Sequence, residues 1–519
     1  MGIFFNPGNG SFTKDRNYEI YVDKTELLKY LNRAIGTPGN CIAVSHARRF
    51  GKSHAAGMID AYYSLGSDSA KLFKGTKIAS DPDYEKYRNK YNVIHLDISS
   101  FWDFHKKDIV EKIIEDIFKE LKMDYPEEFN ERDRISYVLI KIYEKTGIPF
   151  VIIVDEWDCV VRNSTDQDLI HQYLQFLHSL FKSEESKSFL ALGYITGIMP
   201  IKKIKDESAL NNFEEYTMLK SRPITKYYGF TEEEVKALCK RYDMDFETTK
   251  EWYNGYLIDG MHMYNPNSVS QAMKYHDFDS YWRNTSAFGT INNFIMMNYS
   301  GLKEDVLTML SGGKVMVDTE CFQNDLAEIH SKDDALTALI HLGYLGYDAD
   351  MLSAYIPNYE VAKAFQSALK TGEWKDVAAS ISKCDTLLMA TISGNTEKVA
   401  ELIELAHDTY TSILKYNDEN SLSCVLTMAY FTAPAYYTII REMPAGKGFA
   451  DFVFLPRANA GNRPAMIVEL KYNQSADTVI RQIKEKRYQG ALSGYESKIL
   501  LVGISYDSEK HHTCSIEEW

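Results

Sequence analysis

The chain has 519 residues, too many for one hydrophobic core, and this length predicts about three domains. Its 45% hydrophobic and 25% charged residues exclude a disordered protein. The formal net charge of −15 excludes a protein coated in nucleic acid, because such binding depends on neutralising phosphates. No apolar run approaches the roughly 20 residues of a membrane helix, so we expect no membrane association. Seven scattered cysteines without a C-x-x-C pair predict a reducing, cytoplasmic setting and no zinc site.

Short apolar runs alternate with helical stretches over the first part of the chain. The runs are Cys41–Val44, Tyr91–Ile98, Pro149–Asp158 and Phe189–Ile198. Nearly continuous apolar strands separated by helices are typical of a parallel sheet that is covered on both faces. The predicted fold class is therefore α/β, with this sheet in a first domain of residues 1–230.

The first apolar run leads into the loop SHARRFGKS (Ser45–Ser53), which ends like the phosphate-binding pattern G-x-x-x-x-G-K-[ST]. His46 occupies the place of the first glycine. Because a strand precedes the loop and a helix follows it, backbone N–H groups would face a bound phosphate. Lys52 would then contact the β- and γ-phosphates of ATP, and the Ser53 hydroxyl would ligate Mg²⁺. The expected nucleotide ligands in this loop are Arg48, Arg49, Gly51, Lys52 and Ser53.

The third and fourth apolar runs end in polar residues that suit nucleotide hydrolysis. Asp155 is expected to order Mg²⁺, and Glu156 to act as the base that orients the attacking water. Two solvated acids at a strand end are the alternative, and the phosphate-binding loop upstream favours the catalytic interpretation. Thr196 is placed to contact the γ-phosphate, although a threonine starting a turn before Gly197 is nearly as good an explanation. For Arg222, a solvated side chain is preferred to an arginine finger.

The middle of the chain, residues 231–370, is helical by its hydrophobic periodicity. Within it, Asp333–Phe365 has the order helix, two short strands and helix, which is typical of a winged-helix region. From residue 371 to 519 a helical linker is followed by a helix, two strands, a helix and a strand.

Two strands in this last segment carry a second group of charged residues. Asp451 lies near the start of one strand, and Glu469 and Lys471 lie on the next. A period of two places Glu469 and Lys471 on one face and Leu470 in the core. Two carboxylates and a backbone carbonyl suit Mg²⁺ or Mn²⁺, which would activate water for attack on a phosphodiester. Lys471 would stabilise the charge of the pentavalent state or help to position the nucleophile.

This group is the D…(D/E)-x-K arrangement of a restriction-type nuclease. An exposed strand that merely alternates Glu and Lys is the alternative, and the order of helix, hairpin, helix and strand favours the nuclease. Glu419, near the start of the preceding helix, is a candidate third acid. Gln482, on the following helix, is a candidate contact to the metal-bound water or the substrate. For both, an ordinary surface residue is a serious alternative.

Together these motifs resemble a prokaryotic family that joins an AAA-ATPase-like domain to a C-terminal PD-(D/E)XK nuclease domain. The stretches that carry the resemblance are Ile20–Thr25, Ala47–Ser53, Val151–Asp158, Leu210–Phe213, Tyr264–Ser268, Ile356–Val361, Gly446–Phe454, Met466–Lys471 and Leu500–Asp507. Members of that family commonly have an R-R-F-G-K-S loop without the leading glycine. The resemblance implies a P-loop NTPase sheet in residues 1–230, a helical and winged-helix region in 231–370, and a restriction-endonuclease-like α/β domain in 371–519. It also places the family's helical glutamate at Glu419.

The leading hypothesis is an ATP-binding and ATP-hydrolysing protein with a Mg²⁺-dependent nuclease that cleaves DNA. Defence against mobile elements or phage is a fold-level analogy. One alternative is a nucleotide-dependent switch or adaptor whose C-terminal domain binds nucleic acid or protein without cleaving, and the acidic net charge favours it. A further alternative keeps the nuclease but makes the phosphate loop a binder that hydrolyses slowly. AAA-type sites are often completed by a neighbouring subunit, so a homo-oligomer stays open.

Overall fold

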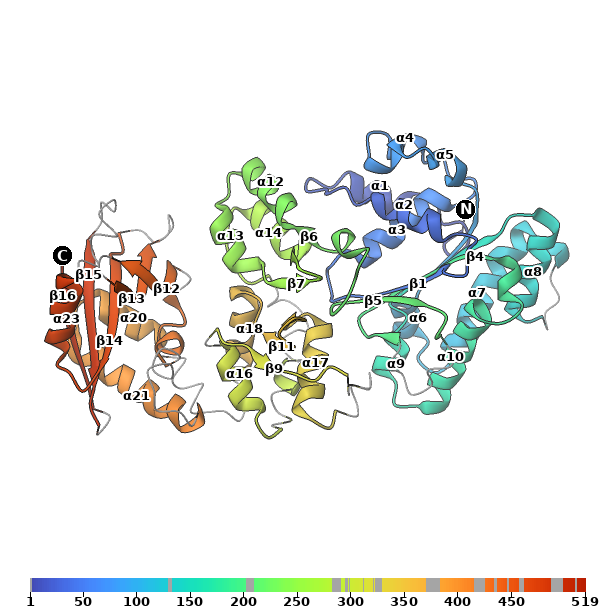
Figure 1. Ribbon diagram of the computed structural model, residues 1–519. Coiled ribbons are helices and arrows are strands. Elements are labelled where there is room, and N and C mark those ends of the chain that lie inside the picture. Colours follow the sequence, from blue (N-terminus) through green and yellow to red (C-terminus); the bar gives the residue numbers. More distant parts are fainter. Residues whose placement is uncertain are drawn as a thin grey trace. The chain divides into compact units, whose positions relative to one another are not determined.

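A computed structural model describes most of the chain (Figure 1). The described residues are 2–128, 133–201, 210–281, 291–294, 297, 299–310, 312–320, 322, 329–369, 383–414, 425–433, 436–445, 448–456, 462–486, 498–508 and 511–519. They form two compact units: Met1–Asp279 with Met316–Pro357, and Ser280–Val315 with Asn358–Trp519. The three-part division at residues 230 and 370 stays a prediction.

A five-stranded sheet lies at the centre of the first unit, with the strand order β2-β3-β4-β1-β5. Its strands, all parallel, are β1 (Cys41–Ser45), β2 (Asn92–Asp97), β3 (Phe150–Asp155), β4 (Leu190–Gly197) and β5 (Glu214–Thr217). The four predicted apolar runs form β1 to β4, so the predicted parallel sheet is confirmed. The prediction missed β5, because its sequence, EEYT, is short and polar and pairs only at the edge.

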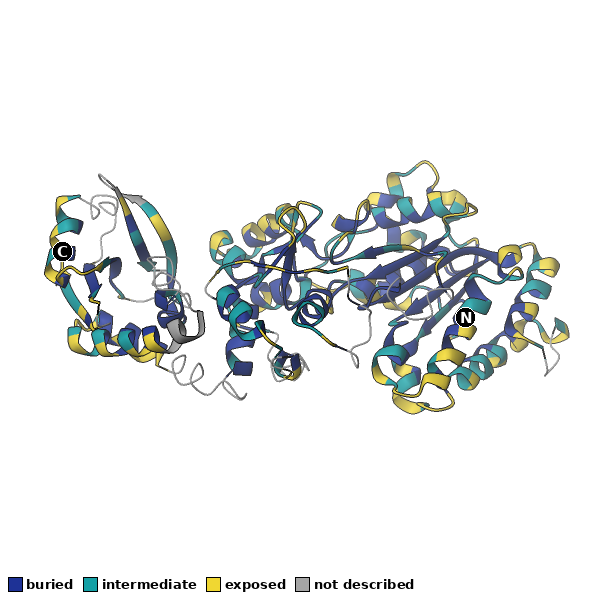
Figure 2. Ribbon diagram, turned by 60° about the horizontal axis from the view of Figure 1, so that its bottom comes forward, coloured by how far each residue is buried: buried dark blue, intermediate teal, exposed yellow. Residues whose placement is uncertain are grey.

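Helices cover both faces of this sheet, which is why β1, β3 and β4 are buried along their whole length (Figure 2). Neighbouring residues of β3 point to opposite faces. Ile153 packs with residues of α2 and α3, and Ile152 packs with residues of α7, α8 and α10. The helices of this region are α1 (Gly10–Arg16), α2 (Glu26–Ala34), α3 (Lys52–Tyr63), α4 (Ala70–Phe73), α5 (Tyr84–Tyr87), α6 (Ile98–Phe104), α7 (Ile109–Asp124), α8 (Ile135–Thr146), α9 (Cys159–Asn163), α10 (Gln167–Phe181) and α11 (Ser186–Phe189).

The rest of the first unit contains further helices and two small groups of strands. These elements are β6 (Phe230–Thr231), α12 (Glu232–Tyr242), α13 (Phe246–Tyr253), β7 (Tyr256–Ile258), β8 (Met261–Tyr264), α14 (Pro266–Tyr275), α17 (Lys332–Leu342), β10 (Gly346–Asp348) and β11 (Ser353–Tyr355). The antiparallel hairpin of β10 and β11 follows α17, and α18 (Tyr359–Leu369) comes next in the chain. This is the order of helix, two strands and helix that the sequence predicted. β9 (Val315–Met316) lies where the chain passes from one unit to the other.

The second unit contains a mixed sheet with the order β12-β13-β14-β15-β16, in which only β14 and β15 run parallel. Its elements, besides α18, are α16 (Leu302–Leu310), α20 (Cys384–Ile392), α21 (Thr396–Leu414), β12 (Tyr437–Ala445), β13 (Gly448–Pro456), β14 (Ala465–Tyr472), α23 (Ala476–Glu485), β15 (Ile499–Tyr506) and β16 (His512–Glu518). The predicted hairpin, helix and final strand are β13, β14, α23 and β15. The two strands that the prediction missed, β12 and β16, are the edges of the sheet.

The described helices include none with a stretch long and apolar enough to cross a membrane.

Candidate nucleotide and metal sites

The predicted phosphate-binding loop connects β1 to α3 in the first unit. Gly51, directly before α3, has φ +90°, a left-handed conformation that glycine adopts without strain. Its carbonyl accepts the first helical hydrogen bond, from the Ala55 N–H at 3.0 Å. The Phe50 side chain is fully buried, and its carbonyl accepts a hydrogen bond from the Gly229 N–H at 2.9 Å. These contacts fix the end of the loop that adjoins α3, and the first N–H groups of α3 face the loop.

His46, in place of the usual first glycine, anchors the loop instead of loosening it. Its side chain is fully buried, and its Nε2 lies 2.5 Å from the Ser221 Oγ. The Ser221 hydroxyl donates its only proton to the Thr217 carbonyl at 2.6 Å, so the imidazole must carry its proton on Nε2. Burial, followed by the charge of Lys52, lowers the pKa of His46 to about 3, which keeps the ring neutral. No local pattern in the sequence pointed to Ser221 as its partner.

Removing the Ser221 hydroxyl should therefore destabilise the loop. We expect Ser221→Ala to lower the free energy of unfolding by about 1–3 kcal/mol, because a buried N–H of His46 loses its acceptor. Urea unfolding followed by circular dichroism measures the change. Ser188→Ala, at an exposed serine, is the control and should change stability by less than about 0.5 kcal/mol. Equal effects of the two substitutions would contradict the assigned hydrogen bond.

Lys52 holds a positive charge inside the loop. Its ammonium donates hydrogen bonds to the carbonyls of His46 at 2.7 Å and Ala47 at 2.9 Å. Burial lowers the pKa of Lys52 to about 8, and the nearby carboxylates, Asp155 first among them, limit the fall. The lysine is still mostly protonated at neutral pH. Ser53, Arg48 and Arg49 are exposed around it.

Asp155 and Thr196 meet because β3 and β4 are neighbours in the sheet. The Thr196 hydroxyl is buried and donates a hydrogen bond to the Asp155 Oδ1, which also accepts one from the Glu156 N–H at 3.1 Å. Glu156 has φ +52°, and burial, together with repulsion from Asp155, raises its pKa. A raised pKa suits a base that must take and release a proton. The structure brings Lys52, Asp155 and Thr196 together at the carboxyl ends of the central strands β1, β3 and β4.

Asp158 and Arg162, which the sequence analysis missed as site residues, stabilise this end of the sheet. The Asp158 carboxylate is fully buried and accepts hydrogen bonds from the N–H groups of Ile198 and Met199, at 3.1 and 2.9 Å. It also accepts one from the Arg162 Nε at 2.7 Å, and the Arg162 Nη2 lies 3.9 Å from the Glu156 Oε2. The spacing of four residues between Asp158 and Arg162 is a signal that could have identified the pair.

A second missed pair, which is partly buried, links α3 to β2. The Nδ1 of His95 lies 2.6 Å from the Oδ2 of Asp60. Burial disfavours the charge of the imidazole, but the attraction of Asp60 outweighs it and raises the pKa of His95 to about 9. The pair therefore ties the helix that follows the phosphate loop to the sheet. The two residues are 35 positions apart, so no local pattern reveals them.

A cavity of about 510 Å³ adjoins the phosphate loop within the first unit. Aromatic and apolar side chains line it, among them Tyr18, Tyr21 and Met58, and Asn267 and Gln271 add amide groups. A cavity that is mostly apolar, with a few polar groups, is typical of small-molecule sites. Its place beside Gly51 suits the base and ribose of a nucleotide whose phosphates lie in the loop.

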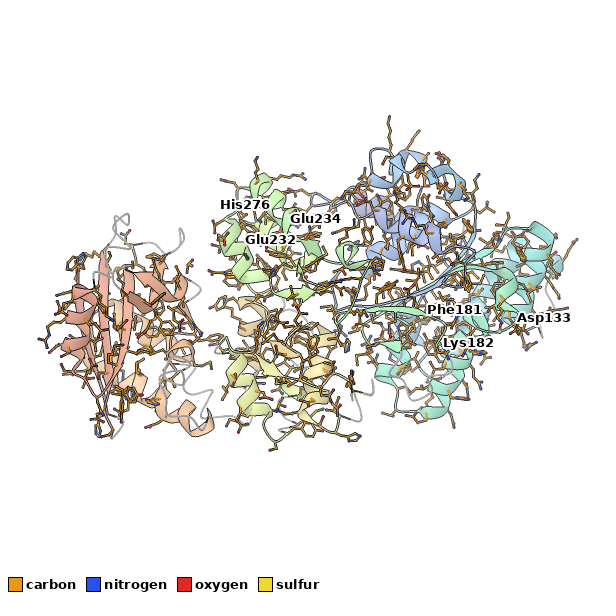
Figure 3. All side chains as sticks on the ribbon, in the orientation of Figure 1. Asp133, Phe181, Lys182, Glu232, Glu234 and His276 are labelled. Atoms are coloured by element: carbon orange, nitrogen blue, oxygen red, sulfur yellow. The ribbon has the colours of Figure 1, made fainter. Side chains whose placement is uncertain are left out.

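The stretch Ile20–Thr25, which carried part of the resemblance, helps to build this cavity. Lys24, one of the lining residues, donates a hydrogen bond to the Glu234 Oε2 at 2.6 Å. Figure 3 labels Glu234 on the first turn of α12, beside Glu232. The Glu234 Oε2 also accepts a hydrogen bond from the Thr231 N–H at 2.8 Å, as part of a capping box. The cavity wall is therefore tied to the start of α12.

The second group of predicted residues comes together on β13 and β14. Regular pairing of the two strands ends where Phe452 faces Val468. Beyond that point the Asp451 side chain replaces the backbone carbonyl as the hydrogen-bond acceptor. Its Oδ2 accepts a hydrogen bond from the Leu470 N–H at 2.7 Å. The Asp451 N–H in turn lies 3.3 Å from the Oε2 of Glu469. The two carboxylates are therefore neighbours at the open end of the hairpin.

Glu469 is the buried centre of this group, with 1% of its surface exposed. Burial, and then repulsion from Asp451, raises its pKa. Its Oε1 lies 3.3 Å from the Lys471 Nζ and 3.2 Å from the Gln482 Nε2 of α23. Two carboxylates face one lysine here, so a divalent cation would neutralise the excess charge, and the oxygen ligands fit Mg²⁺ or Mn²⁺.

The predicted third acid, Glu419, lies outside the described residues. Within the described ranges, no group of three or more acidic, histidine or cysteine side chains could hold a metal ion. The sequence predicted two carboxylates and a backbone carbonyl, and the structure places those two carboxylates and Lys471 together.

Two family models match the regions that contain these sites. Residues 9–205 match a predicted AAA-ATPase, and residues 417–519 match the PD-(D/E)XK nuclease superfamily. The chain has an AAA-ATPase-like region followed by a PD-(D/E)XK nuclease-superfamily region. This is the architecture that the motifs of the sequence indicated.

Individual relatives are distant. An uncharacterized protein in the vnfD 5′ region of Azotobacter chroococcum mcd 1 is 24% identical over 287 residues, which cover 54% of this chain and 53% of that protein. The chain thus spans about half the length of this relative. The ORC2 protein of Aeropyrum pernix, in ADPNP–ADP complexes, has a TM-score of 0.33 at 11% identity, covering 70% of this chain and 97% of that one. The replication initiator DnaA bound to AMPPCP and single-stranded DNA has a TM-score of 0.28 at 11% identity, covering 72% and 93%. Scores this low carry no inference about function.

Proposed function

We propose that the protein is a Mg²⁺-dependent nuclease that cleaves phosphodiester bonds in DNA and is regulated by ATP binding and hydrolysis. The observation that carries the proposal is the meeting of Asp451, Glu469 and Lys471 at the end of the β13–β14 hairpin. A structural hairpin has no need of two neighbouring carboxylates, one of them buried, since their repulsion is costly. The match to the PD-(D/E)XK superfamily supports the same conclusion.

At the nuclease site, Asp451 and Glu469 would hold the metal together with a backbone carbonyl. A bound Mg²⁺ or Mn²⁺ would supply an activated water and Lewis acidity toward the phosphodiester. Lys471, 3.3 Å from Glu469, would place its ammonium against the charge that develops on the phosphorus oxygens. Gln482 orients Glu469 through its amide N–H and would contact the attacking water or the substrate.

At the nucleotide site, the cavity would take the base and the loop would take the phosphates. Lys52 would exchange its carbonyl partners for the β- and γ-phosphates, and Arg48 and Arg49 would add charge outside the loop. Ser53 and Asp155 would hold Mg²⁺, and Glu156 would orient the attacking water. Thr196, whose hydroxyl donates a hydrogen bond to Asp155, would contact the γ-phosphate.

The assignment of the cavity predicts the effect of filling it. We expect Ser270→Trp to weaken ATP binding by at least about tenfold, because Ser270 lines the cavity and is 8% exposed, so that an indole would occupy the space of the base. Isothermal titration with a nonhydrolysable ATP analogue measures the affinity. Ser270→Ala, which leaves the space open, should bind like the parent. Tight binding by both variants would place the base elsewhere.

The direct experiment is incubation of the full chain with labelled DNA and RNA in Mg²⁺, Mn²⁺ or EDTA, each with and without ATP. We expect DNA to be cleaved in Mg²⁺ or Mn²⁺, and we expect this cleavage to stop in EDTA. It is wrong if no nucleic acid is cut with either metal ion.

The acidic net charge of −15 favours one other candidate, a nucleotide-dependent switch or adaptor that binds without cleaving. In that case the protein would bind nucleic acid or a protein partner, and nucleic acid would stay intact in Mg²⁺.

The proposal has three further parts: a cytoplasmic location, assembly as a homo-oligomer, and a role in defence against mobile elements or phage. The role in defence rests on analogy of fold.

A further inference from the structure

A pair of polar side chains, His54 and Asp15, lies in the wall of the cavity beside the phosphate loop. The Nδ1 of His54 lies 2.8 Å from the Oδ1 of Asp15, and both residues line the cavity. His54 directly follows Ser53 in the first turn of α3, and Asp15 belongs to the last turn of α1. The contacts proposed for the β- and γ-phosphates and for Mg²⁺ leave this pair unused.

Close packing of α1 against α3 brings the two residues together (Figure 1). A Cβ atom on Gly57 of α3 would lie 2.6 Å from the Ser11 Oγ of α1, so a glycine at this position lets the helices approach. Asp15 follows Ser11 by four residues, and His54 precedes Gly57 by three. These spacings keep each pair on one face of its helix. The contact between Asp15 and His54 is therefore built into the packing of the two helices.

The hydrogen bond to Asp15 decides which atom of His54 can bind a ligand. A carboxylate only accepts hydrogen bonds, so the Nδ1 of the imidazole must carry the proton. The Nε2 is then the remaining polar atom of the ring, on a side chain that is 75% exposed. It accepts a hydrogen bond when the ring is neutral and donates one when the ring is protonated. A hydroxyl group suits the Nε2 in either state, because a hydroxyl both donates and accepts.

The order of residues along α3 indicates which part of a nucleotide the pair would meet. Lys52 and Ser53 begin the helix at the expected phosphate positions, and His54 comes next. Met58, which is one turn further and about 6 Å along the helix axis, lines the apolar part of the cavity. A nucleotide has the same order, because its ribose lies between the phosphates and the base. The ribose hydroxyls are therefore the ligand groups expected beside His54.

We propose that His54, oriented by Asp15, forms a hydrogen bond with a ribose hydroxyl of the bound nucleotide, so that the site selects ribonucleotides over deoxyribonucleotides. His54 would bind the sugar directly, and Asp15 would be a positioning residue that acts through it. The inference rests on the proposed function for the position of the phosphates. It deepens that function, because it names the sugar that the cavity recognises and the two residues that recognise it.

The test is isothermal titration of the full chain in Mg²⁺ with the β,γ-imido analogue of ATP and with the 2′-deoxy and 3′-deoxy forms of this analogue. We expect the parent to bind the ribose form at least about fivefold more tightly than one of the deoxy forms, which is the effect of one hydrogen bond. His54→Ala and Asp15→Ala should each weaken binding of the ribose form and bring the two affinities to within about twofold of each other.

His171→Ala is the matched control. It removes an exposed histidine of α10 that lies outside the cavity, and it should keep the parental ratio of affinities. His54 is mostly exposed, so His54→Ala should fold like the parent, and circular dichroism checks every variant. If Asp15→Ala does not fold, His54→Ala alone decides.

Equal affinities of the parent for the three nucleotides would overturn the inference and leave the proposed nucleotide site in place. An equal loss of affinity for all three in His54→Ala would also overturn it, because the histidine would then act on the phosphates or on the fold. A parental ratio of affinities in His54→Ala, or in a folded Asp15→Ala, would do the same. If the parent binds none of the three nucleotides, the proposed nucleotide site is itself wrong, and the inference falls with it.

Discussion

Asp451→Asn is expected to reduce cleavage of DNA by about 1,000-fold or more while ATP hydrolysis continues at the parental rate. The substitution keeps the shape of the side chain and its place beside the Leu470 N–H, but it removes one of the two charges that would hold the metal ion. Loss of metal-ion catalysis removes several kcal/mol of transition-state stabilisation, which corresponds to this change in rate. Gel analysis of cleavage products and a phosphate-release assay measure the two activities in the same preparation.

The matched control is Asp477→Asn, which removes an equal charge from an exposed position at the start of α23. It should cleave like the parent. If Asp451→Asn cleaves as fast as this control, the metal site assigned to Asp451 and Glu469 is wrong.

Glu156→Gln is expected to lower the turnover of ATP by about 100- to 10,000-fold with little loss of ATP affinity. Glutamine cannot accept a proton from the attacking water, whereas Lys52 and Ser53, the expected phosphate and metal contacts, are unchanged. Burial raises the pKa of Glu156, so the carboxylate is a stronger base than a solvated one. Phosphate release gives the turnover, and calorimetric titration gives the affinity.

Glu184→Gln, at an exposed side chain, serves as the control for the loss of a negative charge. An equal turnover of ATP in the two variants would show that Glu156 is not the base. The protein would then be a nucleotide binder whose hydrolysis does not depend on this residue.

The sequence predicted the elements whose packing is simplest. Strands β1, β3 and β4 are buried on both faces, so each appears as a continuous apolar run. β12 and β16 are edge strands of mixed polarity, such as HTCSIEE in β16, and give no such run. The alternation of side chains along β14 was enough to place Glu469 and Lys471 on one face, and the short contact between them agrees with it.

Contacts between distant parts of the chain could not be predicted in the same way. The partner of His46 is Ser221, 175 residues further on, and only the folded sheet brings them together. The cavity beside the loop likewise combines Tyr21 with Asn267 and Gln271. Local patterns report which face of an element is buried, but they carry no information about what lies opposite it. The roles assigned to the candidate site residues, Glu419 and Gln482 among them, stay predictions.

ATP-regulated, Mg²⁺-dependent cleavage is tested most directly by measuring DNA cleavage by the full chain and by Lys52→Ala, in Mg²⁺ or EDTA, with and without ATP. We expect both proteins to cleave only in Mg²⁺, and we expect ATP to change the cleavage rate of the parent but not that of Lys52→Ala. Absence of Mg²⁺-dependent cleavage in the parent, or an equal response of both proteins to ATP, would contradict this expectation.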